Sequence, residues 1–216
     1  NAKAGIPPKV ITAKGSVTAN SVMLAGNAYH RLERLKMSGK IFPAAGGIVT
    51  TEPLGEDVAK LINPKDLAVY DCRFVLDYYR MTADNRLLFG GGANYSGRPS
   101  RNIEAEMRPA LEKTFPRLKG VKIDFQWSGM MGIVINRIPQ LGKLSDNVFY
   151  AQGYSGHGIA TTHIVSEIMA NAISGQLDEF DTFAQCKHIR IPGSEWVGNQ
   201  FLAIGMWYYL LMEKLR

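Results

Sequence analysis

The first 26 residues alternate between apolar and polar positions, the pattern of β-strands with one buried face. In the segment KVITAKGSVT, two alternating runs lie on either side of a Lys-Gly turn, and this arrangement predicts a β-hairpin. The following segment, SVMLAG, predicts a buried strand that ends at Gly26. Residues 27–40 are rich in basic side chains and predict a short helical or irregular stretch.

A second hairpin is predicted between residues 68 and 95. On its first arm Tyr78 and Arg80 fall on one face, because side chains alternate along a strand. The tripeptide Ala-Asp-Asn makes the turn. The second arm then ends in three consecutive glycines, Gly90 to Gly92.

Three later segments repeat apolar residues at helical spacing and predict helices near residues 103–115, 158–174 and 199–214. Asn102 is placed to cap the first helix, and Gly175 to end the second. Short strands are also indicated by the alternation in VKIDFQW and the apolar run NVFYAQ. Strand hairpins combined with a few long helices predict an α+β fold with a mostly antiparallel sheet.

The composition is that of an ordinary folded protein, with 46% hydrophobic and 20% charged residues. The longest apolar run, residues 201–212, is too short for a bilayer, which needs about 20 residues. No secretory signal is recognisable at the start, so a cytoplasmic location is expected. Cys72 and Cys186 lie far apart without a CxxC motif, which argues against a disulfide scaffold and a zinc site.

The formal net charge of +6 raises the question of nucleic-acid binding. The basic residues are scattered, however, and no block of five or six like charges or base-reading motif accompanies them. The positive field therefore favours a small anionic cofactor or substrate instead.

The segment that carries candidate chemistry is NVFYAQGYSGHGIATTHIVSEIMANAIS. A strand leads into Gly153, Gly156 and Gly158, and the long helix starts at once. Glycines let the backbone approach a ligand closely, and the first N–H groups of a helix carry the positive end of its dipole. Such a junction suits a phosphate or the electron-rich edge of a reduced flavin.

Two other interpretations of this segment exist. It nearly matches a dinucleotide fingerprint, but the third glycine position is occupied by the β-branched Thr161, and DEFDTFAQ after the helix is not the second strand such a unit needs. That interpretation is rejected. A plain glycine-rich turn before a core helix remains open on composition alone.

The same segment and the residues before it resemble a known protein family. The segment GYSGHGIATTHIVSEIMA, preceded by WSGMMGIVINRIPQLGKLSDNVFYAQ, resembles the C-terminal half of the D-amino-acid-oxidase-type FAD-dependent oxidoreductases, which include glycine oxidase and sarcosine oxidase. Within this family it is most similar to the γ-glutamylputrescine oxidase branch. The likeness extends through VTANSVMLAGNAYH, DYYRMTADNRLLFGGG and the terminal GNQFLAIGMWYYLLMEKL, although Asn27 departs from the usual ending of its motif.

The resemblance implies a domain organisation. Residues 1–40 would be part of the FAD-binding domain, residues 41–135 the substrate-binding domain, and residues 136–216 the C-terminal part of the FAD-binding domain. Family members open with a strand, GxGxxG and a helix, and this start is missing here, so the likeness covers the C-terminal portion only. Non-covalent FAD is expected to need that missing N-terminal half, which another polypeptide could carry.

The activity implied by the resemblance is oxidation of a C–N bond. A γ-glutamylputrescine-like amine and O₂ would be converted to an imine or aldehyde, ammonia and H₂O₂, with the cofactor carrying the hard chemistry. No metal, nucleic acid or membrane is expected to take part. The alternative is a cofactor-free fragment or subunit that acts as a non-catalytic partner-binding protein.

The resemblance also implies roles for individual residues. The expected cofactor-binding residues are Ala25, Gly26, Asn27, Pro139, Gly153, Ser155, Gly156, His157, Gly158 and Ile159. The expected catalytic residues are His157, Tyr154 and Tyr78. The expected substrate-binding residues are Tyr78, Arg80 and Arg137.

Each side-chain role has a simpler alternative. His157 is equally well explained as an exposed turn residue, and Arg137 as the partner of a surface carboxylate. Tyr78 fits the core or the surface of a sheet. The apolar stripes of the helices are expected to be core.

Overall fold

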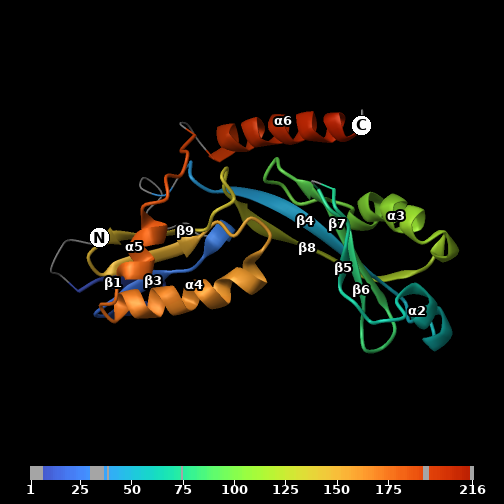
Figure 1. Ribbon diagram of the computed structural model, residues 1–216, viewed down its shortest axis with the longest axis horizontal. Helices are drawn as coiled ribbons and strands as arrows, with labels where there is room; N and C mark the ends of the chain where they lie inside the picture. The colour runs from blue at the N-terminus through green and yellow to red at the C-terminus, as the bar shows by residue number, and fades with distance from the viewer. Residues whose placement is uncertain (1–6, 30–36, 38, 74, 192–194, 215–216) are drawn as a thin grey trace. The chain divides into compact units, whose positions relative to one another are not determined.

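The computed structural model describes residues 7–29, 37, 39–73, 75–191 and 195–214, and its elements confirm the α+β class (Figure 1). The strands are β1 (Lys9–Thr12), β2 (Gly15–Thr18), β3 (Val22–Leu24), β4 (Phe42–Thr51), β5 (Val69–Tyr70), β6 (Tyr78–Met81), β7 (Leu87–Asn94), β8 (Ile123–Ile133), β9 (Gln140–Ser145) and β10 (Val148–Gln152). The helices are η1 (Asn27–Tyr29), α2 (Glu56–Ile62), α3 (Ile103–Thr114), η2 (Pro116–Leu118), α4 (Gly158–Ile173), α5 (Asp178–Ala184) and α6 (Glu195–Lys214).

The predicted hairpins and long helices are confirmed. The strand predicted before Gly26 forms as β3, but the expectation that it is buried is wrong, because none of its three residues is buried. β1 and β2 pair antiparallel with Val10 opposite Val17, and β6 pairs antiparallel with β7. Of the basic stretch 27–40, η1 is helical, while residues 30–36 and 38 lie outside the described part of the chain. Among the described helices, none is long and apolar enough to cross a membrane.

The chain divides into two compact units. The first contains residues 1–43 and 131–198, and the second contains residues 44–130 and 199–216. The functional domain boundaries named above remain a prediction.

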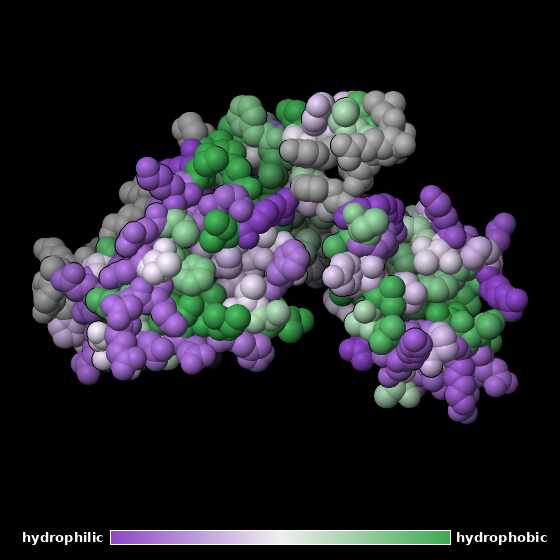
Figure 2. Space-filling model, in the orientation of Figure 1, coloured by the Kyte–Doolittle hydropathy of each residue, from purple (hydrophilic) through white to green (hydrophobic). Residues whose placement is uncertain are grey.

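In the first unit, β10 lies at the centre of a three-stranded sheet. It pairs parallel with β3 and antiparallel with β9, so the sheet has the order β3-β10-β9. Helices α4 and α5 pack on this sheet through a cluster of buried side chains: Leu141, Phe149, Ala151, Val165, Ile168, Met169, Ala172 and Phe180. Outside this contact α4 keeps apolar side chains exposed, including Ile159 and Ile164, so the expectation that its apolar stripe is core is wrong at Ile164. Figure 2 shows apolar surface where α4 lies.

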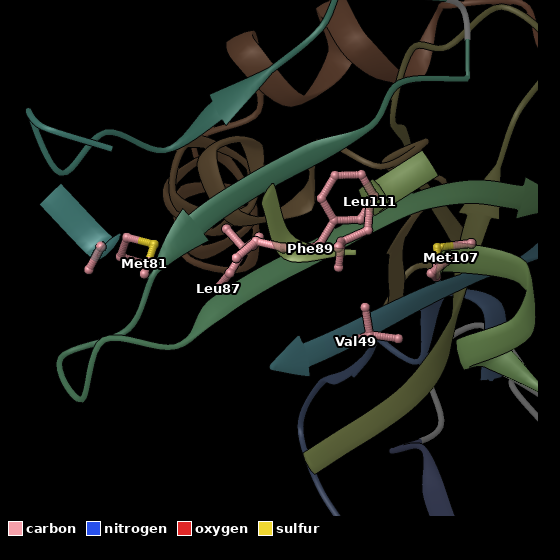
Figure 3. Close-up of a cluster of buried hydrophobic side chains, with 8 residues drawn as sticks. Val49, Met81, Leu87, Phe89, Met107 and Leu111 are labelled. Atoms are coloured by element: carbon pink, nitrogen blue, oxygen red, sulfur yellow. The ribbon is translucent and has the colours of Figure 1, made fainter. Parts of the chain in front are cut away.

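The second unit is built on a five-stranded sheet with the order β5-β6-β7-β4-β8. One face of this sheet and α3 enclose a buried cluster, shown in Figure 3. The cluster contains Val49, Ala59, Met81, Leu87, Phe89, Met107, Leu111 and Leu118. The predicted cap of α3 is confirmed: the Asn102 side chain accepts a hydrogen bond from the backbone N–H of Ala105 at 3.0 Å.

Gly205 gives a prediction about this unit. It lies inside α6, and a Cβ placed on it meets no atom within 4 Å. Because glycine is the poorer helix former, Gly205→Ala is expected to raise the free energy of unfolding by about 0.5–1 kcal/mol. Urea unfolding followed by circular dichroism checks this. An unchanged or lower midpoint would contradict the open environment of Gly205.

Candidate functional site

The glycine-rich turn between β10 and α4 follows a left-handed backbone path. Gly153 has φ +80° and Gly156 has φ +96°, and Ser155 between them has φ +53°. Glycine adopts such angles without the steric cost that a Cβ brings. Gly153 and Gly156, which were predicted to shape this turn, therefore do so because they adopt positive φ angles.

The start of α4 is open toward the surface. The helix begins at Gly158, its N-cap residue His157 makes no side-chain capping hydrogen bond, and its first turn holds no acidic residue. Gly156, His157 and Ile159 are exposed. Unpaired N–H groups at a helix start carry partial positive charge, so this end of α4 can receive an electron-rich group.

Asn27 braces the turn from a distant part of the sequence. Its side-chain Oδ1 accepts a hydrogen bond from the backbone N–H of Gly153 at 2.9 Å. The same oxygen lies so close to Gly132 that a Cβ there would overlap it. Asn27 itself has φ +45°, a conformation that asparagine tolerates better than most residues. The resemblance predicts a backbone contact with the nucleotide for Asn27, and the structure adds that its side chain joins the loop after β3 to the glycine turn.

Ser155 is turned inward. It is buried, its backbone N–H donates to the carbonyl of Gly132 at 2.9 Å, and its Oγ accepts from the backbone N–H of Val134 at 3.2 Å. These bonds attach the turn to the end of β8. Ser155 thus supports the turn from within, and its predicted contact with a cofactor stays a prediction.

Tyr154 packs against Gly158 and against the core. A Cβ on Gly158 would lie 3.6 Å from the Cβ of Tyr154, an ordinary contact distance. Tyr154 is half-buried against the α4 cluster, and burial raises the pKa of its phenol. A packing role for Tyr154 is therefore visible, whereas its predicted catalytic role is not tested.

The loop that follows β8 carries Arg137 and Pro139. Arg137 is exposed, has φ +62° and donates its backbone N–H to the carbonyl of Val134 at 3.2 Å. Asn136 anchors the loop by donating from Nδ2 to the carbonyl of Lys187 at 3.1 Å. Pro139 is half-buried. The predicted residues at 25–27, 137–139 and 153–159 all belong to the first unit.

Tyr78 and Arg80 belong to the second unit. Their neighbours on β6, Tyr79 and Met81, face the α3 cluster, so Tyr78 and Arg80 lie on the opposite face of the sheet. Tyr78 is half-buried and Arg80 is exposed. The shared face predicted for this pair agrees with the geometry.

A buried pair of glutamines, which was not predicted from the sequence, lies beside the turn. Gln152 donates from Nε2 to Oε1 of Gln140 at 2.9 Å, and Gln140 donates from Nε2 to the carbonyl of Lys40 at 2.9 Å. Both amides are almost fully buried. The available signal was a polar residue at the end of the apolar strand NVFYAQ, directly before Gly153.

A cavity of about 200 Å³ adjoins this pair. It is lined by Met37, Lys40, Lys143, Leu144, Tyr150 and Gln152. None of the predicted flavin contacts is among these residues, so the glycine turn and the cavity are separate features of the described chain. Among the residues that the structure describes, no group of three or more His, Cys, Asp or Glu side chains could hold a metal ion.

The geometry of the turn fits a flavin in one specific respect. Gly156 is exposed, and a Cβ there would meet only the sulfur of Met131, at 3.7 Å. Next to it stands the uncapped, acid-free start of α4. An uncrowded backbone beside an electropositive helix end is the arrangement expected around an electron-rich ring edge.

Comparison with known proteins agrees with this geometry. Residues 2–172 match the family model described as "DAO: FAD dependent oxidoreductase". The chain is 44% identical to the gamma-glutamylputrescine oxidoreductase of Escherichia coli, over 97% of this chain and 49% of that protein. It is 36% identical to the probable oxidoreductase OrdL of Haemophilus influenzae, over 96% of this chain and 48% of that protein. The chain therefore spans about half the length of these relatives.

Solved structures show the same fold. The L-proline dehydrogenase of P. horikoshii superimposes with a TM-score of 0.63 at 24% identity, over 77% of this chain and 46% of that one. The glycine oxidase of Geobacillus kaustophilus does so with a TM-score of 0.62 at 20% identity, over 82% of this chain and 48% of that one.

Proposed function

The chain belongs to the DAO family of FAD-dependent oxidoreductases, and from this membership we propose that it forms the flavin-facing and substrate-facing half of an amine oxidase. The proposed substrate is a γ-glutamylputrescine-like amine. Its C–N bond is oxidised by O₂ to an imine, which water converts to an aldehyde with release of ammonia, and O₂ is reduced to H₂O₂. The 44% identity to the E. coli gamma-glutamylputrescine oxidoreductase supports this substrate class.

The observation that carries the proposal is the open glycine turn at the start of α4. Bound FAD supplies the electron acceptor for the oxidation. In the proposal the backbone at Gly156 and Gly158 approaches the flavin ring, and the positive end of α4 stabilises negative charge that develops there. His157 stands at the same helix end and adds a hydrogen-bond donor.

The remaining predicted residues contribute positioning. Ala25, Gly26 and Asn27 are tied to the turn through the Asn27–Gly153 bond, and we assign them to the nucleotide side of the cofactor. Pro139 and Arg137 belong to a loop that would help to hold the bound cofactor, and Arg137 would pair with an anionic group of the substrate. Tyr78 and Arg80, on their shared sheet face, contact the substrate.

Flavin binding tests the proposal directly. The chain is purified alone and together with the nucleotide-binding half of the E. coli relative, and visible absorption is recorded. We expect the two bands of oxidised flavin in the mixture, and H₂O₂ on addition of γ-glutamylputrescine. A matched control adds putrescine without the glutamyl group. A protein that stays colourless in both preparations would leave only the non-catalytic alternative.

A further inference from the structure

Each of the three consecutive glycines of β7 is required for a different structural reason. A Cβ on Gly90 would overlap the ring of Tyr78, and a Cβ on Gly91 would overlap Oδ1 of Asp77. Gly92 has φ +56°, a left-handed conformation. Gly90 and Gly91 thus receive the side chains of two consecutive residues, the one before β6 and the first one of β6.

The part of Tyr78 that lies over Gly90 is its hydroxyl end. Tyr78 and Gly90 are directly opposite each other in the antiparallel register. A Cβ on Gly90 would stand 2.5 Å from both Cε2 and the hydroxyl oxygen of Tyr78. The ring therefore leans from β6 across β7. Since β7 is the middle strand of the order β5-β6-β7-β4-β8, the hydroxyl reaches the centre line of the sheet.

The backbone beside Tyr78 is held as well. The N–H of Asp71 donates to the carbonyl of Asp77 at 3.0 Å, and the N–H of Asp77 donates to Oδ1 of Asp71 at 3.2 Å. The guanidinium of Arg73 joins the carboxylates of Asp71 and Asp77. These contacts fix the backbone from which the Tyr78 side chain extends. The absence of a side chain at Gly90 leaves room for the hydroxyl end of its ring.

We propose that Gly90 is a positioning residue for substrate binding, because its bare backbone seats the Tyr78 phenol so that the hydroxyl stands at the centre of the substrate-facing sheet. The proposal rests on the substrate contact assigned to Tyr78 under the proposed function. An alanine at position 90 pushes the hydroxyl away from the strand, since contacts of 2.5 Å to a Cβ cannot be kept. Burial raises the pKa of the Tyr78 phenol, so the seat favours the neutral form that donates a hydrogen bond.

The first readout needs neither cofactor nor substrate. The protein is labelled with fluorotyrosine, the Tyr78 resonance is assigned by its loss in Tyr78→Phe, and its phenol is titrated by fluorine NMR. In Gly90→Ala we expect the phenol pKa to move down toward its ordinary value, because the ring leaves its buried seat. An unchanged Tyr78 resonance and pKa in Gly90→Ala would show that Gly90 does not position the phenol.

The second readout is kinetic and uses the flavin-loaded protein. Both Gly90→Ala and Tyr78→Phe are expected to raise KM for the amine about tenfold, the value of one hydrogen bond, with a smaller change in kcat. Gly205→Ala serves as the control, because its Cβ enters open space. If the resonance shifts while KM stays constant, the seat exists but Tyr78 does not contact substrate, and the positioning role fails.

A double variant removes the remaining ambiguity about folding. In a Tyr78→Ala background the Cβ introduced by Gly90→Ala no longer meets a ring, so this second substitution should change KM by less than about twofold further. If Gly90→Ala alone fails to fold, the double variant should fold. Failure of both variants would show that Gly90 acts through the strand itself, which contradicts the proposal.

Discussion

In the preparation that combines this chain with the nucleotide-binding half, Gly153→Ala is expected to abolish retention of FAD. Gly153 is buried with φ +80°, and a Cβ there would overlap Cγ1 of Val134. The left-handed angle costs an alanine about 1–2 kcal/mol, and overpacking adds about 1–3 kcal/mol. The turn has to shift to relieve both, and the backbone proposed to approach the flavin shifts with it.

The expected size follows from these two costs. A combined loss of about 3 kcal/mol corresponds to a dissociation constant that rises more than about 100-fold. The ratio of flavin to protein absorption after gel filtration measures retention, and fluorescence quenching of added FAD measures the dissociation constant. Retention of FAD at the unaltered level by Gly153→Ala would contradict the role given to the turn.

Two variants separate the contributions. Gly175 also has positive φ, at +99°, but a Cβ there meets nothing within 4 Å, so Gly175→Ala reports the conformational cost without the overlap. We expect it to lower stability by about 1 kcal/mol and to leave FAD binding intact. Adding Val134→Ala to Gly153→Ala removes the overlapping Cγ1. The Cβ of residue 134 that remains would lie 3.6 Å from the new Cβ at position 153, an ordinary contact distance. This double variant should recover part of the affinity.

Asn27→Ala is expected to weaken FAD binding by roughly tenfold to 100-fold. The substitution removes the acceptor for the Gly153 N–H, and an unpaired buried donor costs about 1–3 kcal/mol. It also places alanine at φ +45°, which disfavours the native loop further. Flavin titration and thermal unfolding give the two effects separately.

Asn27→Gly is the matched variant. Glycine adopts the left-handed angle freely but offers no acceptor, so the loss should be smaller than for alanine and still measurable. Gly132→Ala should resemble Asn27→Ala, because its Cβ would overlap the same Oδ1. Wild-type affinity in all three variants would show that the Asn27–Gly153 bond has no part in forming the site.

The loop around Ser155 shows where sequence reasoning about the site stopped. The family resemblance placed it among the contacts to the cofactor, and nothing in the segment indicated that both its N–H and its hydroxyl bond to the end of β8 and the residue after it. Short elements were also missed. α2 and β9 have few residues, and their formation depends on packing more than on a visible period.

The sequence by itself determined the features that arise from local interactions. The hairpins follow from alternation and turn residues, α3 follows from its cap and four-residue spacing, and the left-handed turn before α4 follows from its glycines. The order of these motifs was also enough to indicate the family, which the match over residues 2–172 shows.

Only the tertiary structure decided which distant groups meet. Asn27 bonds to Gly153 across 126 positions, Gln140 bonds to the carbonyl of Lys40 across 100, and the Tyr78 hydroxyl lies over Gly90. Such contacts depend on strand register and on the direction of each side chain. Both are set when the whole core packs, and neither leaves a periodic signal in the chain.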